Sequence, residues 1–566
     1  MFKWLKSGSP WIWLTGGAVS ISLLSVLGLL LLIGWKGLTY FWPAPLYQWQ
    51  VNSSVEQVHT LQDSVNLANR DEVPVAIIGE LYHRETVLAD NLNAADRATL
   101  PAQQHSTERL NIKIANRDLY SADFIAVLES RLLAPTTPHG LVVVERARGG
   151  YFFGRPVSYQ TSSAIEEKQI EKALTQGVER SSLLRQSIDD LVNQEIKRLS
   201  WQLEKLRLDK RKKDLNNTLT NRYIIEHNRD RAQLIAKLTA VEAELDDLKR
   251  QLEAESLSVE DMTGQIVTIP LSQILDFWYP NDMTYLDKLG HWGVQVWKFI
   301  TDNPRESNSE GGVFPAIFGT VLMVLIMAIV VMPLGVIAAI YLHEYAKNNA
   351  FTRVIRIAVI NLAGVPSIVY GVFGLGFFVY TIGGSIDSLF YAERLPAPTF
   401  GTPGLLWSAL TLAVLTLPVV IVTTEEGLSR IPSSVRHGSL ALGATQFETM
   451  WRIILPMASP AIITGLILAI ARAAGEVAPL MMVGVVKLAS SLPVDDQFPY
   501  IHLDRKFMHL GFHIYDVGFQ TTNIEAARPL VYATSFLLVT VIIGLNLTAI
   551  SIRNNLRETY RTLGQD

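Results

Sequence analysis

Arg472 and Glu476 are the two residues whose type and spacing suggest chemistry most directly. They lie four positions apart in a long apolar run, 459–486, and one face of a helix would carry both. Ionisable side chains cost about 2.5–3.5 kcal/mol inside a membrane-spanning helix and therefore indicate function. A guanidinium suits the oxygens of an anionic solute, and a nearby carboxylate can pair with it when the site is empty and compete for release. Gly475 leaves room for a solute, although an ion pair that only fixes helix packing is the alternative.

A second group of polar residues lies in the apolar run 355–382. Asn361 and Ser367 stand there beside Gly364 and Pro366. A helix interrupted by glycine and proline can open backbone groups towards a cavity, which makes these side chains candidates for the same solute pathway. Small residues in a span also serve simply to pack helices.

The elements that would position these residues are membrane-spanning helices. A helix needs roughly 20 apolar residues to cross about 30 Å of hydrocarbon. The chain has six such runs, at 12–34, 314–342, 355–382, 404–423, 459–486 and 530–552. The first run is read as an uncleaved anchor because no cleavage pattern follows it.

Composition agrees with a membrane protein and excludes several other classes. Hydrophobic residues make up 49% of the 566 residues, and a net charge of −4 gives no sign of nucleic-acid binding. The chain has no cysteine, so thiolate metal sites and cysteine nucleophiles are excluded. Lys and Arg favour the inner side of the short loops, which predicts two cytoplasmic termini and an outside segment from 43 to about 310.

The long segment between the first two spans predicts an α+β insertion outside the membrane. Strand-like runs indicate a β-rich region at 43–163. Apolar residues at alternating steps of three and four predict a coiled-coil hairpin at 164–256, either a rigid spacer or a docking surface. A return segment at 257–310 has an aromatic-rich stretch that suits an interfacial helix or, equally well, core packing. The segment 1–42 holds the N-terminus and first span, and 311–566 the other five spans.

The loop 424–458 is the longest cytoplasmic segment, yet it is too short for a catalytic domain. The sequence has no GxxxxGK[ST] motif, so a partner would have to supply the energy of any driven process. Gly443, Ile453, Leu455 and Pro456 stand at the spacing of the "EAA---G---------I-LP" loop and so resemble the coupling loop of ABC importer permeases. In that family two short helices meet at the glycine and fit a groove of the ATPase. Glycine also permits the positive φ of such a turn.

The loop departs from the family pattern where the pattern has Glu-Ala-Ala. His437, Gly438 and Ser439 occupy those three positions, so one expected carboxylate contact with the ATPase is missing. Glu425 and Glu426, a few residues upstream, are the candidates to supply that charge.

A wider resemblance is to the phosphate-specific ABC importer permeases of the PstA type, in their extended form with a large periplasmic insertion. Segments such as "NLAGVPSIVYGVFGLGFF" (361–378) and "ILAIARAAGEVAPLM" (467–481) carry it. The resemblance implies an all-α polytopic fold with six transmembrane helices, the ABC type I importer permease fold, in a bacterial inner membrane. It also identifies Arg472 and Glu476 as the suspected pathway element.

The same resemblance implies partners and a division of labour. The chain would pair with a second homologous permease, an ATPase dimer and a periplasmic phosphate-binding protein, and it would transport phosphate across the lipid bilayer. It would be no enzyme and hold no metal or cofactor, since the ATPase uses ATP and Mg. Two rivals remain: a permease for another oxyanion, such as molybdate or sulfate, and a membrane receptor or scaffold built on the coiled coil.

Overall fold

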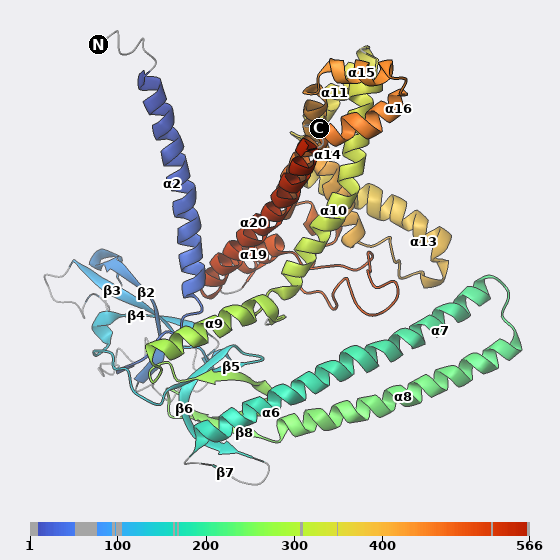
Figure 1. Cartoon of the computed structure of the whole chain (residues 1–566). Coiled ribbons are helices and arrows are strands. Elements are labelled where there is room, and N and C mark those ends of the chain that lie inside the picture. Colours follow the sequence, from blue (N-terminus) through green and yellow to red (C-terminus); the bar gives the residue numbers. More distant parts are fainter. Residues whose placement is uncertain are drawn as a thin grey trace. The chain divides into compact units, whose positions relative to one another are not determined.

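The computed structural model describes residues 9–50, 76–92, 97, 105–120, 122–161, 165–166, 169–305, 310–347, 349–521 and 524–562. These residues form two compact units (Figure 1). One unit contains 1–40 and 299–566, and the other contains 41–298. The predicted β-rich region 43–163 lies partly outside the described residues.

The unit 41–298 is built on two antiparallel sheets. The first has the order β1-β2-β3-β4, and the second has the order β10-β5-β6-β8-β9, with β7 paired to β6. Buried alternate side chains of the strands form their cores, including Trp49, Ile112 and Val143 in one cluster and Phe152 and Leu257 in the other. The strands are β1 (Leu46–Gln50), β2 (Ala76–Leu88), β3 (Ser106–Lys113), β4 (Phe124–Leu128), β5 (Val142–Arg146), β6 (Tyr151–Gln160), β7 (Ile165–Glu166), β8 (Ser256–Glu260), β9 (Ile266–Pro270) and β10 (Ile274–Trp278).

A long helical hairpin is inserted along the chain between strands β7 and β8 of the second sheet. Helix α6 (Ile170–Asp190), the π-helical segment η3 (Leu191–Ile196) and α7 (Lys197–Leu215) form one arm, and α8 (Asn221–Glu253) forms the other. In Figure 1 the arms run side by side and join at the turn where Asn217 has a φ of +53°. Strands β6 and β8 pair directly, so the sheet holds both ends of the hairpin together. The two predicted helices are present, and their coiled-coil packing stays a prediction.

The aromatic-rich return segment 257–310 was open to two interpretations, core packing and an interfacial helix, and the two apply to different parts of it. Trp278 at the end of β10 is buried in the first core and meets Tyr151 edge to face. Helix α9 (Tyr285–Thr301) instead exposes Tyr285, Leu286 and Trp297. Core packing therefore accounts for Trp278, and a position of α9 at a membrane interface stays a prediction.

Among the described residues, the other unit has six helices long and apolar enough to cross a membrane: Ile12–Thr39, Phe314–Tyr345, Ser367–Phe390, Leu405–Ser429, Gln446–Gly475 and Ala527–Asn555. Each of them overlaps one of the six predicted spans, with two corrected boundaries. The run 355–382 is not one helix. Helix α11 (Ala350–Leu362) ends before Gly364, and α12 (Ser367–Phe373) begins after Pro366, because proline disfavours the helical conformation of the residue before it.

The second correction concerns the run 459–486. Helix α17 (Leu455–Gly475) ends before Glu476, whose ψ of 131° is that of extended chain, and a separate short helix α18 (Leu480–Val483) follows. The proline at position 479 has no N–H to continue a helix ladder. Arg472 and Glu476 are therefore not on the face of one continuous helix.

Helix α14 (Leu405–Ser429) lies at the centre of this unit and is its most buried candidate span. It contacts α10 (Phe314–Ile340) and α17, and α17 in turn contacts α20 (Ile524–Thr562). Glycines allow close approach: a Cβ at Gly335 of α10 would lie 2.5 Å from Val420, and one at Gly427 would lie 2.3 Å from Ala461.

The N-terminal helix α2 (Ser9–Thr39) contacts α20 through its C-terminal part. A Cβ at Gly37 would lie 2.8 Å from the backbone of Ala533, and one at Gly34 would meet the ring of Phe536. The two helices meet at one end and diverge at the other (Figure 1). The rest of α2 presents apolar side chains such as Trp13 and Leu24 at its surface, as a helix surrounded by lipid does.

The remaining helical elements of this unit either form part of the candidate spans or connect them. They are η6 (Tyr341–Tyr345), η7 (Gly374–Gly383), α13 (Gly384–Phe390), η8 (Ala392–Arg394), α15 (Ser433–Ala441), α16 (Gln446–Thr449), η9 (Met450–Ile454) and α19 (Leu510–Phe519). A two-residue strand pair, β11 (Pro304–Arg305) with β12 (Glu310–Gly311), precedes α10.

Candidate functional site

The segment that joins α14 to α17 folds as two short helices around a glycine turn. Helix α15 starts after Pro432 and ends at Ala441, and α16 starts at Gln446. Between them Gly443 has a φ of +90°, a conformation that L-residues resist. Thr445 caps α16 reciprocally with Glu448: its hydroxyl accepts from the Glu448 N–H at 3.2 Å, and its own N–H donates to the Glu448 carboxylate at 2.9 Å.

A buried hydrogen bond holds the two short helices together. The hydroxyls of Ser439 on α15 and Thr449 on α16 lie 2.8 Å apart. Of the three residues at the Glu-Ala-Ala positions, only Ser439 faces inward, while His437 and Gly438 are exposed. Ile453, Leu455 and Pro456 are half-buried where η9 passes into α17. The predicted coupling residues of this loop therefore lie on α15, at the Gly443 turn and at the junction of η9 with α17.

The exposed face of this turn carries large apolar side chains that the sequence analysis did not select. Leu442 is 90% exposed, and Phe447 and Trp451 are also exposed, with their rings stacked 6.4 Å apart. An exposed apolar patch on a polar loop is typical of a protein contact surface. The signal in the sequence was the pair of aromatic residues four positions apart in "QFETMWR".

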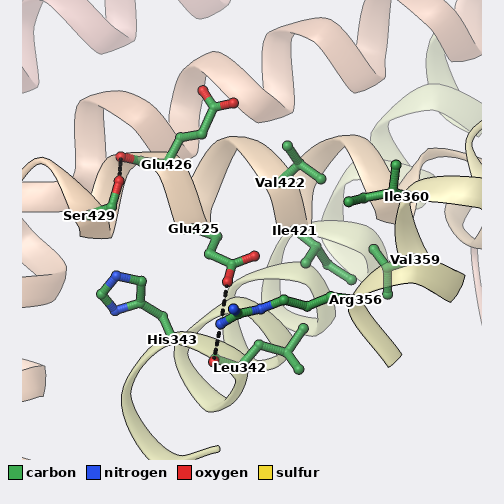
Figure 2. A pocket seen from close by; sticks show the side chains of 10 residues that line it. All are labelled: Leu342, His343, Arg356, Val359, Ile360, Ile421, Val422, Glu425, Glu426 and Ser429. Atoms are coloured by element: carbon green, nitrogen blue, oxygen red, sulfur yellow. Dashed lines mark hydrogen bonds and ion pairs between the residues drawn. The ribbon is translucent and has the colours of Figure 1, made fainter. Parts of the chain in front are cut away.

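Glu425 and Glu426 have different surroundings (Figure 2). Glu425 is half-buried on α14 and forms an ion pair of 2.9 Å with Arg356 of α11. Both glutamates line a cavity of about 390 Å³ bounded by η6, α11 and α14. Glu426 is exposed, so of the two it is the one that remains accessible to a partner.

Arg472 and Glu476 remain close although α17 ends between them. The Nε of Arg472 lies 3.5 Å from the Glu476 carboxylate, and the two side chains are 33% and 20% exposed. Arg472 occupies the last turn of α17, where the helix dipole favours a cation. A Cβ added at Gly475 would meet nothing within 4 Å, so space is open beside the ion pair.

The third candidate span reaches the chain just beyond Glu476. A Cβ at Gly371 of α12 would lie 2.8 Å from the Cα of Pro479, which shows that the two backbones touch. Tyr370 donates a hydrogen bond of 2.6 Å to the carbonyl of Leu362 and so closes the turn between α11 and α12. The α12 helix is therefore packed against the broken end of α17.

The other two predicted pathway residues, Asn361 and Ser367, lie on either side of that turn. Asn361 is exposed near the end of α11, and Ser367 is half-buried at the start of α12. In the part of the chain that the structure describes, neither side chain forms a hydrogen bond or ion pair with Arg472 or Glu476. The described residues also contain no cluster of three or more His, Cys, Asp or Glu placed to hold a metal ion.

Comparison with known proteins gives the same assignment for the helical unit. Residues 331–562 match the family of binding-protein-dependent transport system inner membrane components. The phosphate transport system permease protein PstA 1 of Mycobacterium tuberculosis is 34% identical over 244 residues, which cover 43% of this chain and 71% of that protein.

A probable ABC transporter permease, YqgH of Bacillus subtilis, is 33% identical over 36% of this chain and 63% of its own length. The inward-facing MetNI methionine ABC transporter is similar at 17% identity and a TM-score of 0.32, over 46% of this chain and 98% of that one. At that TM-score the likeness adds nothing to the assignment. The extensive match to PstA 1 and to the family model shows that this membrane protein belongs to the PstA-type permeases of ABC transporters.

Proposed function

We propose that this chain is a permease subunit of an ATP-driven importer of inorganic phosphate and forms half of its translocation pathway. The observation that carries the proposal is the Arg472–Glu476 ion pair at the broken end of α17. A discontinuous membrane helix with ionisable side chains at its break is the usual place for a solute site in transporters. Relatives named as phosphate transport system permeases support phosphate as the solute.

The pair suits passage better than tight binding. The Arg472 guanidinium offers planar paired donors to phosphate oxygens, and Glu476 competes for the same donors once the solute moves on. At 3.5 Å the two side chains are close enough to pair when no solute is bound. The space beside Gly475 is open, and α12 borders the proposed site because it contacts the chain at Pro479. Asn361 and Ser367 stay candidates further along the pathway.

Energy would enter through the segment 424–458. As a permease component the chain is not itself an enzyme. A partner ATPase dimer, using ATP and Mg, would contact the exposed face around Leu442, Phe447 and Trp451, and His437 and Glu426 are accessible beside it. A second homologous permease would complete the pathway. A phosphate-binding protein would deliver the solute on the periplasmic side, where we place residues 43 to about 310, with both termini in the cytoplasm.

The test is uptake of radiolabelled phosphate by proteoliposomes that contain the whole complex, with ATP hydrolysis recorded in parallel. Arg472→Gln removes charge-assisted hydrogen bonds of about 1.5–3 kcal/mol, so uptake should fall about tenfold or more. Arg528→Gln is the matched control because Arg528 is exposed at the start of α20. Hydrolysis should continue in both variants.

Four outcomes separate the possibilities. Loss of uptake only in Arg472→Gln supports the proposed site. Unchanged uptake in that variant would restrict Arg472 to a structural role. If the native complex takes up molybdate or sulfate and no phosphate, the proposal of phosphate as the solute is wrong. If it takes up none of these anions and no ATPase co-purifies with it, the result supports the scaffold alternative.

A further inference from the structure

One arginine of the short helix α15 joins the ends of two membrane helices. The guanidinium of Arg436 lies 2.8 Å from the Glu344 carboxylate, and it donates a hydrogen bond of 2.9 Å to the carbonyl of Leu428 near the end of α14. Glu344 belongs to η6, the π-helical continuation of α10. The Arg436 and Glu344 side chains are only 23% and 19% exposed, so water screens their attraction weakly.

Apolar packing accompanies this ion pair but does not replace it. Val435 of α15 packs in one cluster with Ile340 of α10 and Leu428 of α14. Apolar contact is non-directional and therefore specifies the orientation of α15 less sharply than a hydrogen bond does. A charge-assisted bond from a planar guanidinium holds one geometry, so Arg436 sets the position of α15 relative to both helices.

A second ion pair extends the connection to the neighbouring helix. Arg356 of α11 pairs with Glu425 of α14 at 2.9 Å and donates to the carbonyl of Leu342 in η6 at 2.8 Å. Figure 2 shows Arg356 between these two partners at the edge of the cavity. Together, the two arginines connect α15, η6, α11 and α14 by polar contacts. The π-helical form of η6 is a type of segment that is frequent at functional sites.

We propose that the Arg436–Glu344 ion pair is the link that transmits movement of the ATPase-contacting turn to helix α10, with Arg356–Glu425 carrying it on to α11. The inference rests on the proposed function, since it presumes that an ATPase moves α15. Arg436 and Glu344 act as positioning residues and touch neither the solute nor the nucleotide. Without the pair, α15 still moves with the ATPase, while α10 follows it incompletely.

The test measures phosphate taken up per ATP hydrolysed in proteoliposomes that contain the whole complex. Arg436→Gln and Glu344→Gln should each lower this ratio about five- to tenfold while hydrolysis continues, the usual size of coupling between two sites. The double variant Glu344→Arg with Arg436→Glu reverses the pair and should recover much of the ratio. Arg353→Gln is the matched control, because Arg353 is exposed on α11 and forms no ion pair among the described residues.

Each outcome decides the inference. An unchanged ratio in either single variant overturns it, and so does an equal fractional loss of uptake and hydrolysis, which indicates damaged folding or docking. If the single variants do not assemble, the reversed pair decides: a near-native ratio supports the link, while failure to assemble or a low ratio overturns it. Absence of phosphate uptake by the native complex contradicts the proposed function instead and is seen before any variant is compared.

Discussion

Alanine at Gly443 should destabilise the turn between α15 and α16 through backbone conformation alone. Gly443 has a φ of +90°, and a Cβ added there would meet nothing within 4 Å. No steric clash therefore contributes, and the cost is that of a left-handed L-residue, about 1–2 kcal/mol. That energy lowers the ratio of closed to open turn by about 5- to 30-fold.

Gly438 provides a control in the same segment, because alanine there should stabilise the structure where alanine at Gly443 destabilises it. It lies inside α15, has an ordinary helical conformation and also has open space around the Cβ position. Gly438→Ala should stabilise the helix by about 0.5–1 kcal/mol, because alanine loses less backbone entropy than glycine on folding. The two substitutions add the same methyl group, so their difference isolates the φ requirement.

Amide hydrogen exchange of the purified complex measures both effects directly. The amides that close the turn, such as those of Leu442 and Glu448, should exchange about 5- to 30-fold faster in Gly443→Ala and more slowly in Gly438→Ala. Equal exchange in Gly443→Ala and the native chain, or a shift of both variants in one direction, would refute the argument from backbone conformation.

Three further predictions concern other parts of the chain. Gly37→Leu should push α2 away from α20 and lower thermal stability by about 1–3 kcal/mol, whereas Gly28→Leu on the open part of α2 should change it little; equal effects would contradict close packing. Partial burial raises the pKa of Asp495, but hydrogen bonds from Arg505, the Gln497 N–H and His502 outweigh it and lower that pKa. The contribution of Asp495 to the stability of the loop between α18 and α19 is therefore complete above about pH 4 and is lost as the pH falls through the lowered pKa. Hydrogen exchange against pH checks this, and a loop equally protected at lower pH would count against it. Asn281→Ala should cost about 1–3 kcal/mol of unfolding free energy in the 41–298 unit, since the amide satisfies three backbone groups; an unchanged melting temperature would show that water replaces it.

The sequence alone determined the features that depend on local composition and spacing. Six apolar runs were long enough to span a membrane, and six candidate spans are present in the described residues. The strand-like runs became β2, β3 and β5, because alternating β-branched side chains favour the half-buried surface of a sheet. The resemblance to the coupling loop of ABC importer permeases predicted a turn at Gly443, and the residue has the positive φ that glycine adopts without strain.

Tertiary structure alone decided which charged side chains meet. Glu425 was selected as a candidate for contact with an ATPase, which stays a prediction, and only the packing of α11 against α14 showed that it lies beside Arg356. The pairing of Arg436 with Glu344 was not predicted, because it depends on where α15 lies beside η6. The end of α17 at Gly475 also could not be predicted from hydropathy, because the apolar residues continue beyond the break. Apolar burial is proportional to area and can be read from composition, whereas an ion pair needs two particular atoms within a few ångströms, and only the packed helices set that distance.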